Sequence, residues 1–218
     1  MKTDTLTRAW QAQSLLVGYP DEQLYARLDL LERAGATLDD PVGAPLRRFV
    51  AHLRRTAPAQ AAADYVSTFD HRRRCCLFLT YYAHGDTRKR GMALLRLKQT
   101  YSAAGLHLVD DELPDHLAVL LEFAATDPRP GAELLIEHRA GLELLRLALR
   151  DTASPWADVL DSVSTTLPPL GADLRAAVAR LAAEGPPEEQ VGLAAFAPPE
   201  YMPGPRPPAA PQPLGADR

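Results

Sequence analysis

The apolar residues of this chain are mainly leucine and alanine, with a single isoleucine, Ile136, and this feature constrains the fold more than any other. Aromatic residues make up only 6% of the sequence, so the chain has little of the β-branched and aromatic content that strands favour. Its 218 residues, 46% of them hydrophobic, suffice for one sizeable domain with a buried core. We therefore predict an all-α fold built as a single helical domain.

Periodic apolar residues, interrupted by glycine and proline, predict eight to ten helices between residues 1 and 184. Leu6, Trp10 and Val17, for example, recur at helical spacing before Gly18-Tyr19-Pro20 ends the first helix. A helix of about 20 residues is expected after Pro130. The other expected helices cover approximately residues 6–17, 21–34, 45–56, 58–69, 71–84, 88–104, 114–125, 156–164 and 170–183.

The composition of the chain changes from Gly185 onward. Ten of its 20 prolines fall between Pro186 and Pro213, in a region with little periodic apolar content. We therefore predict two parts, a helical domain at residues 1–184 and a disordered or extended proline-rich tail at residues 185–218.

Charge and hydropathy exclude several classes of partner. The formal net charge is −4, and lysine and arginine are spread along the chain, which does not support nucleic-acid binding. The N-terminus MKTDTLTRAW lacks the apolar core of a signal peptide, and no stretch approaches the roughly 18 apolar residues of a spanning helix. We expect the protein to work in the cytoplasm without stable insertion in a membrane.

The sequence carries no spacing typical of a catalytic or metal site. It has no glycine-rich phosphate loop, no HExxH, no GxSxG and no pair of CxxC units, and its six histidines lie apart. Cys75 and Cys76 are adjacent, which suits neither an ordinary disulfide nor a metal chelate, so we interpret them as small buried hydrophobic residues. We predict no catalytic residues and no metal ligands.

Residues 110–125, DDELPDHLAVLLEFAA, combine an acidic loop with a short helix that is expected to begin at Pro114. Crowded carboxylates followed by apolar residues at helical spacing predict a hydrophobic surface with an acidic rim, suited to holding another protein. His116 beside Asp115 is also a candidate acid–base pair, although carboxylates at a helix start ordinarily complement the helix dipole. The carboxylates are Asp110, Asp111, Glu112 and Asp115, and the apolar residues are Leu117, Leu120, Leu121 and Ala124.

Two further features allow a structural and a functional interpretation. Tyr65 and Phe69 lie at i and i+4 on one helix face, where they fit the core; alternatively, Tyr65 lines a groove for a partner peptide. Two basic clusters, Arg72–Arg74 and Arg88–Arg90, flank the helix expected at 71–84. They fit a solvated face; alternatively, they pair with acidic groups of a partner or with an anionic cofactor precursor.

Three separated segments together carry a family resemblance: YVSTFD at 65–70, HGDTRKRGMALL at 84–95, and the 110–125 stretch with ELPDH at 112–116. Over roughly residues 8–170, the chain resembles the nitrate reductase molybdenum cofactor assembly chaperones, the NarJ branch of the TorD-like redox-enzyme chaperones. That wider family has a Tyr-x-x-x-Phe helix segment and a Glu-x-Pro-x-Asp-His-like loop, which correspond here to Tyr65–Phe69 and Glu112–His116. The basic segment HRRRCC departs from the family pattern.

The resemblance implies a TorD-like helical bundle that is a chaperone and not an enzyme. It implies binding of the N-terminal segment of the apo catalytic (alpha) subunit of nitrate reductase before that subunit docks at the membrane. The client then receives molybdopterin guanine dinucleotide, while the chaperone holds no permanent cofactor. The expected client-peptide residues are Tyr65, Phe69, Asp110, Asp111, Glu112, Leu113, Pro114, Asp115, His116, Leu117, Leu120, Leu121 and Glu122, with His84, Asp86, Arg88 and Arg90 as candidate rim or anion contacts.

Two other functions stay open at the level of sequence. One is a chaperone for a different molybdenum oxidoreductase, although the HGDTRKRG turn favours the nitrate branch. The other is a small helical enzyme that acts on an anionic ligand at the basic clusters. Both a monomer and a dimer, including one swapped through a hinge at residues 105–113, are compatible with the sequence.

Overall fold

The computed structural model describes residues 2–109 and 112–185, and within them the expected all-α fold is confirmed. These described residues form twelve α-helices and one short 3-10 helix, and contain an isolated backbone bridge but no strand. The α-helices are α1 (Thr3–Val17), α2 (Glu22–Ala26), α3 (Leu28–Ala36), α4 (Asp40–Arg55), α5 (Pro58–Phe69), α6 (Leu79–His84), α7 (Arg88–Ala103), α8 (Leu117–Thr126), α9 (Pro128–Glu137), α10 (Arg139–Asp151), α11 (Ala157–Thr166) and α12 (Ala172–Glu184), and the 3-10 helix is η1 (Arg73–Cys75).

The helices outnumber the eight to ten expected because some expected helices are divided. Arg27, with φ −99° and ψ 0°, separates α2 from α3, and His138, with φ −91° and ψ 12°, separates α9 from α10. A single residue with ψ near 0° ends one helix and begins the next without disturbing the apolar spacing on either side, so periodicity alone does not reveal such a break.

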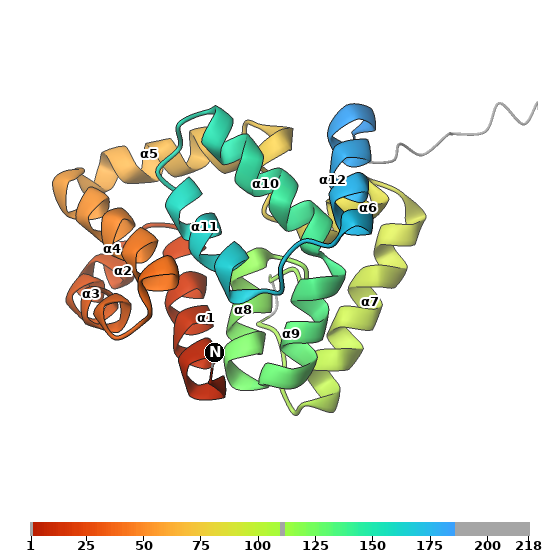
Figure 1. Cartoon of the computed structure of the whole chain (residues 1–218), viewed down its shortest axis with the longest axis horizontal. Helices are drawn as coiled ribbons and strands as arrows, with labels where there is room; N and C mark the ends of the chain where they lie inside the picture. The colour runs from red at the N-terminus through yellow and green to blue at the C-terminus, as the bar shows by residue number, and fades with distance from the viewer. Residues whose placement is uncertain (1, 110–111, 186–218) are drawn as a thin grey trace, which may run out of the picture. The chain divides into compact units, whose positions relative to one another are not determined.

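The centre of the bundle is formed by α1 packed along α8, with α9 on the other side of α8 (Figure 1). Trp10 and Leu16 of α1 are buried, as are Leu117 and Leu121 of α8. Ser14 fixes the register of the pair, because its hydroxyl donates a hydrogen bond to the carbonyl oxygen of Ala118 at 2.8 Å. This packing decides which face of α8 is hidden from solvent.

A second part of the core is an aromatic cluster around Trp156, which is 1% exposed and precedes α11. The rings of Phe49, Tyr65 and Phe69 lie 5.5, 5.6 and 5.5 Å from the Trp156 ring, between centroids. Large aromatic rings bury much apolar area each, so this cluster joins α4 and α5 to the segment before α11.

Helices α10 and α11 are linked by a partly buried ion network. Glu143, 1% exposed, accepts a hydrogen bond from Arg146 at 2.7 Å, and its carboxylate forms an ion pair with Arg139 at 2.9 Å. Arg146 also contacts Asp161 of α11 at 3.1 Å. Arg139 Nη2 donates to the Ser164 carbonyl at 3.0 Å. Removing one member would leave a buried charge without its partner, so the network holds the two helices in one arrangement.

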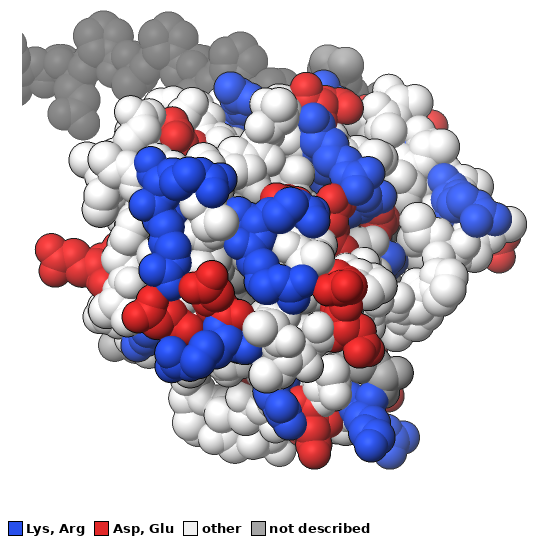
Figure 2. All heavy atoms as spheres, turned by 60° about the vertical axis from the view of Figure 1, so that its left-hand side comes forward, with Lys and Arg blue, Asp and Glu red and all other residues white. Residues whose placement is uncertain are grey.

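Charged side chains of both signs alternate over the face that carries α3 and α4, as Figure 2 shows. Arg54 there contacts Asp29 at 2.5 Å and Glu32 at 2.8 Å, and Arg48 contacts Asp158 at 2.5 Å. A surface with such mixed charge does not form the continuous basic patch that nucleic acids require.

The described residues end at Gly185, so the proline-rich tail expected at 185–218 lies outside them apart from that residue. The division into parts at residue 184 therefore stays a prediction. None of the helices within the described residues is long and apolar enough to cross a membrane.

Candidate functional site

The loop at residues 112–116 is pinned to the segment before α6 by main-chain hydrogen bonds. The amide of Leu79 donates to the Asp115 carbonyl at 2.9 Å, and the amide of Leu117 donates to the Leu77 carbonyl at 2.9 Å. The two segments thus run antiparallel for a few residues, with Phe78 opposite His116. The single helix expected at 71–84 is therefore wrong, because these residues form η1, then this extended pairing, and then α6.

Asp115 is fully buried beneath this pairing, and its side chain joins three elements. Carboxylate oxygen Oδ2 accepts a hydrogen bond from the hydroxyl of Thr80 in α6 and lies 3.4 Å from Arg90 Nη2 of α7. The other oxygen, Oδ1, has no hydrogen-bond partner among the described residues. A buried carboxylate needs such partners, so Asp115 acts as an internal link and is not on the exposed acidic rim that we expected.

His116 is the N-cap of α8, which begins at Leu117 and not at Pro114 as expected. Its Nδ1 accepts the amide proton of Ala118 at 3.2 Å, so the ring must carry no proton on that nitrogen. Burial lowers the pKa of His116, while the neighbouring Asp115 carboxylate raises it to a smaller degree. Pro114 is buried, and its carbonyl accepts from the hydroxyl of Tyr101 at 2.7 Å.

Arg90 connects the buried link to the surface. Its side chain is 19% exposed, and its guanidinium lies 3.2 Å from exposed Asp86 as well as 3.4 Å from Asp115. The central carbon of the Arg90 guanidinium lies 5.8 Å from the centroid of the Phe78 ring, within the range of a cation–π contact. Arg88, by contrast, is exposed at the start of α7.

The turn between α6 and α7 depends on Gly85, whose φ is +57°. Its amide donates to the Tyr81 carbonyl at 2.7 Å and closes α6, a position where glycine avoids the steric cost of a Cβ atom. The carbonyl of His84, which is half-buried, accepts from the Thr87 hydroxyl at 2.8 Å. His84 thus shapes the turn through its backbone.

These elements surround a pocket of about 340 Å³, here named the α5–α7 pocket. It gathers four residues that the sequence singled out, Phe69, Arg73, Asp86 and Arg90, and four that it did not assign to a binding site. Of the four missed residues, Cys76, Phe78 and Tyr81 lie in the incorrectly predicted helix at 71–84, and Asp70 directly precedes it. The complete lining is Phe69, Asp70, Arg73, Cys76, Phe78, Tyr81, Asp86 and Arg90.

The apolar face of α8 is not an open surface, contrary to our expectation. Leu117, Leu120 and Leu121 are at most 1% exposed, because α1 and α9 pack over α8. Their spacing is that of a core stripe, which any amphipathic helix of a bundle carries. In the described structure they support the site from inside and are not accessible to a peptide.

Tyr65 also belongs to the core. It is 7% exposed, its ring lies 4.7 Å from that of Phe69, and its hydroxyl donates to the Val17 carbonyl at 3.4 Å. Burial raises the pKa of the Tyr65 phenol well above its ordinary range. The structural interpretation is therefore correct for Tyr65, whereas Phe69, 8% exposed, combines core packing with a place in the wall of the α5–α7 pocket.

The remaining residues of the expected acidic rim lie around a second, smaller pocket. This linker pocket, of about 180 Å³, is formed by the end of α7, the linker after it and one face of α8. Glu112 and Glu122 are exposed and line it, and Leu113, 42% exposed, lies beside Glu112 in the chain. Asp110 and Asp111 lie outside the described residues. The lining consists of Tyr101, Leu106, His107, Leu108, Val109, Glu112, Val119, Glu122, Phe123 and Thr126.

The two cysteines are free thiols. Cys75 is buried, as expected, and Cys76 is partly buried in the wall of the α5–α7 pocket. Burial raises the pKa of both thiols, which favours the protonated form. Within the described part of the chain, histidine, cysteine and carboxylate side chains nowhere gather in a group of three that could hold a metal ion.

Comparison with known proteins assigns the chain to a family. A family model described as nitrate reductase delta subunit matches residues 36–161, which is more than half of the chain. The chain belongs to the nitrate reductase delta subunit family. The match spans every residue that lines the two pockets, so both lie inside the part that the family shares. The resemblance found in the sequence is thereby confirmed.

Relatives in this family differ in length. The chain is 42% identical over 158 residues to the nitrate reductase-like protein NarX of Mycobacterium tuberculosis, but covers only 24% of that protein. A Bacillus subtilis protein provisionally named nitrate reductase molybdenum cofactor assembly chaperone NarJ is 30% identical over 176 residues, covering 78% of this chain and 94% of the relative.

A solved structure supports the fold. It is an Archaeoglobus fulgidus protein provisionally described as a redox enzyme maturation protein, 24% identical, with a TM-score of 0.56. The match covers 73% of this chain and 91% of the archaeal chain. At this identity the likeness concerns the arrangement of helices.

Proposed function

We propose that this protein is a dedicated assembly chaperone for a nitrate reductase. It binds the N-terminal segment of the apo catalytic (alpha) subunit in the cytoplasm and holds the subunit until molybdopterin guanine dinucleotide has been inserted and the complex can dock at the membrane. Family membership and the name of the B. subtilis relative support this role, and that name describes assembly and not catalysis. The cofactor belongs to the client, and the chaperone holds none permanently.

The observation that carries the proposal is the composition of the α5–α7 pocket. Phe69, Phe78 and Tyr81 supply aromatic surface, and charges of both signs surround it, among them Arg73 and Asp86. Aromatic surface with a charged rim is typical of sites that bind peptides, because apolar anchors provide most of the affinity while charges steer and orient the segment. The site therefore suits a short amphipathic segment and needs no catalytic group.

A holding protein must also release its client. A dissociation constant between micromolar and tens of nanomolar, about −8 to −10 kcal/mol, combines useful occupancy with release. The modest volume of the pocket fits this range, because it accommodates a few side chains and not a whole helix.

Isothermal titration calorimetry with a synthetic peptide of about 30 residues, taken from the N-terminus of the catalytic subunit in the same genome, tests the proposal. We expect one-to-one binding with a negative heat-capacity change, because apolar surface is buried. Tyr81→Ala should weaken binding about tenfold or more, since it removes an aromatic wall. Absence of heat at every temperature, with the helical fold intact, would refute N-terminal recognition.

Two arginine variants provide a matched pair. Arg73 lines the α5–α7 pocket, and the adjacent Arg72 is also exposed but does not line it. Arg73→Glu should change the affinity for the peptide several-fold, whereas Arg72→Glu changes the net charge equally and should leave the affinity nearly unchanged. Equal effects of both variants would indicate a long-range charge effect and not a contact in the pocket.

A further inference from the structure

The linker pocket and the α5–α7 pocket lie at opposite ends of α7. Arg90 in the first turns of this helix lines the α5–α7 pocket, and Tyr101 near its end lines the linker pocket. At a rise of 1.5 Å per residue, the backbone positions of these residues are about 16 Å apart. One side chain of a ligand cannot occupy both pockets, so they are two distinct hollows of the surface.

The floor of the linker pocket is rigid and apolar. Tyr101 and Phe123 are 2% and 3% exposed, and their ring centroids lie 4.5 Å apart. The Tyr101 hydroxyl is fixed by its hydrogen bond to the Pro114 carbonyl. A preformed floor loses little conformational entropy when a ligand binds.

The walls of the linker pocket carry apolar side chains that the fold leaves partly uncovered. Leu106, Leu108 and Val119 pack against the core but are only partly buried, and Val109 is 74% exposed. A hollow of about 180 Å³ with such walls fits one side chain of the size of leucine or phenylalanine.

The rim of the linker pocket is acidic. Glu112 from the loop and Glu122 from α8 are exposed, and neither forms an ion pair with another described residue. The carboxylates of neighbouring α9 differ in this respect: Glu133 lies 3.7 Å from Arg129, and Glu137 lies 2.8 Å from Arg96. The charges of Glu112 and Glu122 are thus available to a cationic ligand.

We infer that the linker pocket is a second docking site, which takes an apolar side chain flanked by lysine or arginine from an extended segment of the client. Acidic side chains at the rim disfavour anionic lipids and nucleic acids, so charge complementarity selects a basic peptide. That this segment belongs to the client rests on the proposed function. The kind of side chains that the pocket accepts does not depend on it.

A second docking site changes how the client is held. When one client molecule occupies both sites, the second contact forms at the high effective concentration set by the first. Two weak contacts then hold a partly assembled subunit firmly, and loss of either one permits release.

The chemistry of the linker pocket can be tested without the client. The probe is the peptide acetyl-Lys-Lys-Leu-Phe-Lys-Lys-amide, and the matched probe carries glutamate in place of each lysine. NMR of methyl groups in the full-length chain reports binding at Val109 and Val119. We expect saturable chemical-shift changes with the lysine peptide and none with the glutamate peptide. The dissociation constant of the lysine peptide should be about 0.1 mM and should increase as salt is added.

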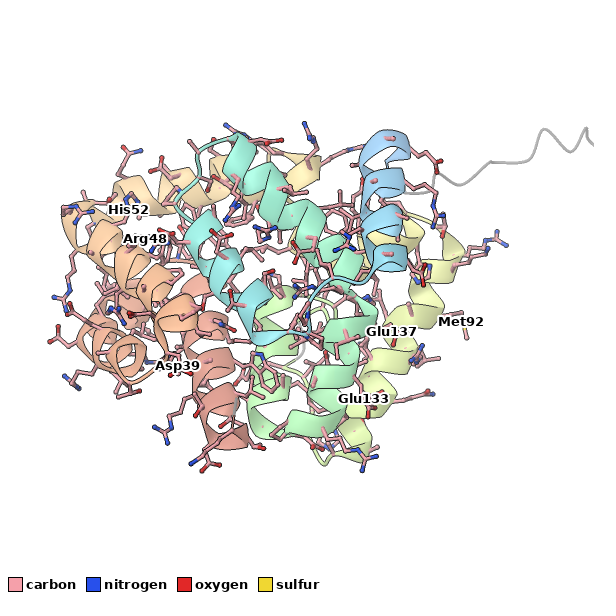
Figure 3. The ribbon with its side chains drawn as sticks, in the orientation of Figure 1. Asp39, Arg48, His52, Met92, Glu133 and Glu137 are labelled. Atoms are coloured by element: carbon pink, nitrogen blue, oxygen red, sulfur yellow. The ribbon has the colours of Figure 1, made fainter. Side chains whose placement is uncertain are left out.

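Charge reversal on the rim is the decisive variant. Glu122→Lys should weaken binding of the lysine peptide about tenfold, which corresponds to about 1.4 kcal/mol. Glu133→Lys on neighbouring α9, labelled in Figure 3, makes the same charge change outside the pocket and should have little effect. Shifts with the glutamate peptide, absence of saturable shifts, or equal losses in both variants would overturn the inference.

Overlapping 15-residue peptides from the client's catalytic subunit then distinguish the inference from the proposed function. We expect at least one basic peptide whose binding is lost in Glu122→Lys and kept in Tyr81→Ala. If the N-terminal peptide fails to bind while the lysine probe still binds at Val109 and Val119, the proposed function is wrong and the docking site stands. If the N-terminal peptide binds and the lysine probe does not, the proposed function stands and the inferred docking site is wrong.

Discussion

His116 performs two structural tasks with one imidazole ring. Its Nδ1 caps the first turn of α8, and its ring packs against Phe78 with centroids 5.3 Å apart. The cap requires an unprotonated Nδ1, and burial of the ring disfavours the charged imidazolium. The cap and the packing of His116 therefore both depend on the neutral ring. The carboxylate of Asp115 raises the pKa of His116, but by less than burial lowers it.

The lowered pKa of His116 predicts a loss of stability in mild acid. As the pH falls through the ordinary histidine value of 6.5, the unfolded chain binds the proton first, so the free energy of unfolding declines toward the lower, folded-state pKa. His116→Asn keeps a side-chain acceptor for the cap and removes the titration. It should stay within about 1 kcal/mol of the original protein at pH 7.5 and decline less between pH 7.5 and 5.5.

Urea unfolding followed by circular dichroism at the two pH values measures this effect. His138 has a pKa lowered by burial as well, so His116→Asn should reduce the decline without abolishing it. Exposed His71 provides the control, because His71→Asn should leave the decline unchanged. An identical decline in His116→Asn and the original protein would contradict the role given to His116.

At the scale of single residues, the sequence predicted that Asp115, His116, Asp86 and Arg90 matter, but not how they meet. Asp86 and Arg90 form an i,i+4 pair, but the contacts among Thr80, Arg90 and Asp115 join residues 10 to 35 positions apart, and the sequence contains no periodic signal for such pairs. The run Cys75–Phe78 is apolar and short, and such runs are ambiguous between a helix and a buried extended segment. Phe78 and Tyr81 of the α5–α7 pocket were missed because a continuous helix was predicted there.

At the scale of elements, α8 and α9 approach so closely that no side chain fits between them at one point. A Cβ atom built on Gly131 of α9 would lie 2.3 Å from the Ala124 Cα of α8. The neighbouring backbone cannot yield as a flexible side chain would, so a methyl group there must push the helices apart. This contact keeps α8, which lines the linker pocket, in place.

Two glycine variants should therefore have opposite effects on stability. Gly131→Ala should lower the free energy of unfolding by about 1–3 kcal/mol through overpacking. A methyl group added to Gly91 within helix α7 would meet no atom within 4 Å, so Gly91→Ala should raise the free energy of unfolding by about 0.5–1 kcal/mol through helix propensity. Denaturant unfolding of the two variants checks the pair, and a neutral Gly131→Ala would contradict the close approach of α8 and α9.

Most helices could be predicted from the sequence because leucine and alanine at a period of 3.6 residues identify them directly. The same pattern could not decide whether Leu117, Leu120 and Leu121 face a partner or the core, since both uses need the same stripe. The decision lies in the packing of α1 over α8, a contact between segments about 100 residues apart. Of the expected acidic rim, Glu112 and Glu122 are exposed and line the linker pocket, Asp115 is buried, and Asp110 and Asp111 lie outside the described residues.

At the scale of the whole molecule, the buried core formed by the described residues ends in the sequence before the proline-rich segment begins. Buried apolar side chains of the described residues lie between Ala9 and Val178, and the ion network of α10 and α11 lies within the same span. Both pockets are lined by residues 69–126. A chain that ends after Gly185 therefore contains each interaction to which we attribute folding and binding.

Removal of residues 186–218 should change the free energy of unfolding by less than about 0.5 kcal/mol, the range typical of changes outside a core. The dissociation constant for the N-terminal client peptide should stay within about twofold, because neither pocket loses a wall. Denaturant unfolding and calorimetry of the shortened and full-length chains measure the two quantities. A clear loss of stability would place part of the core in the proline-rich segment. A loss of affinity at unchanged stability would instead give that segment a direct part in holding the client.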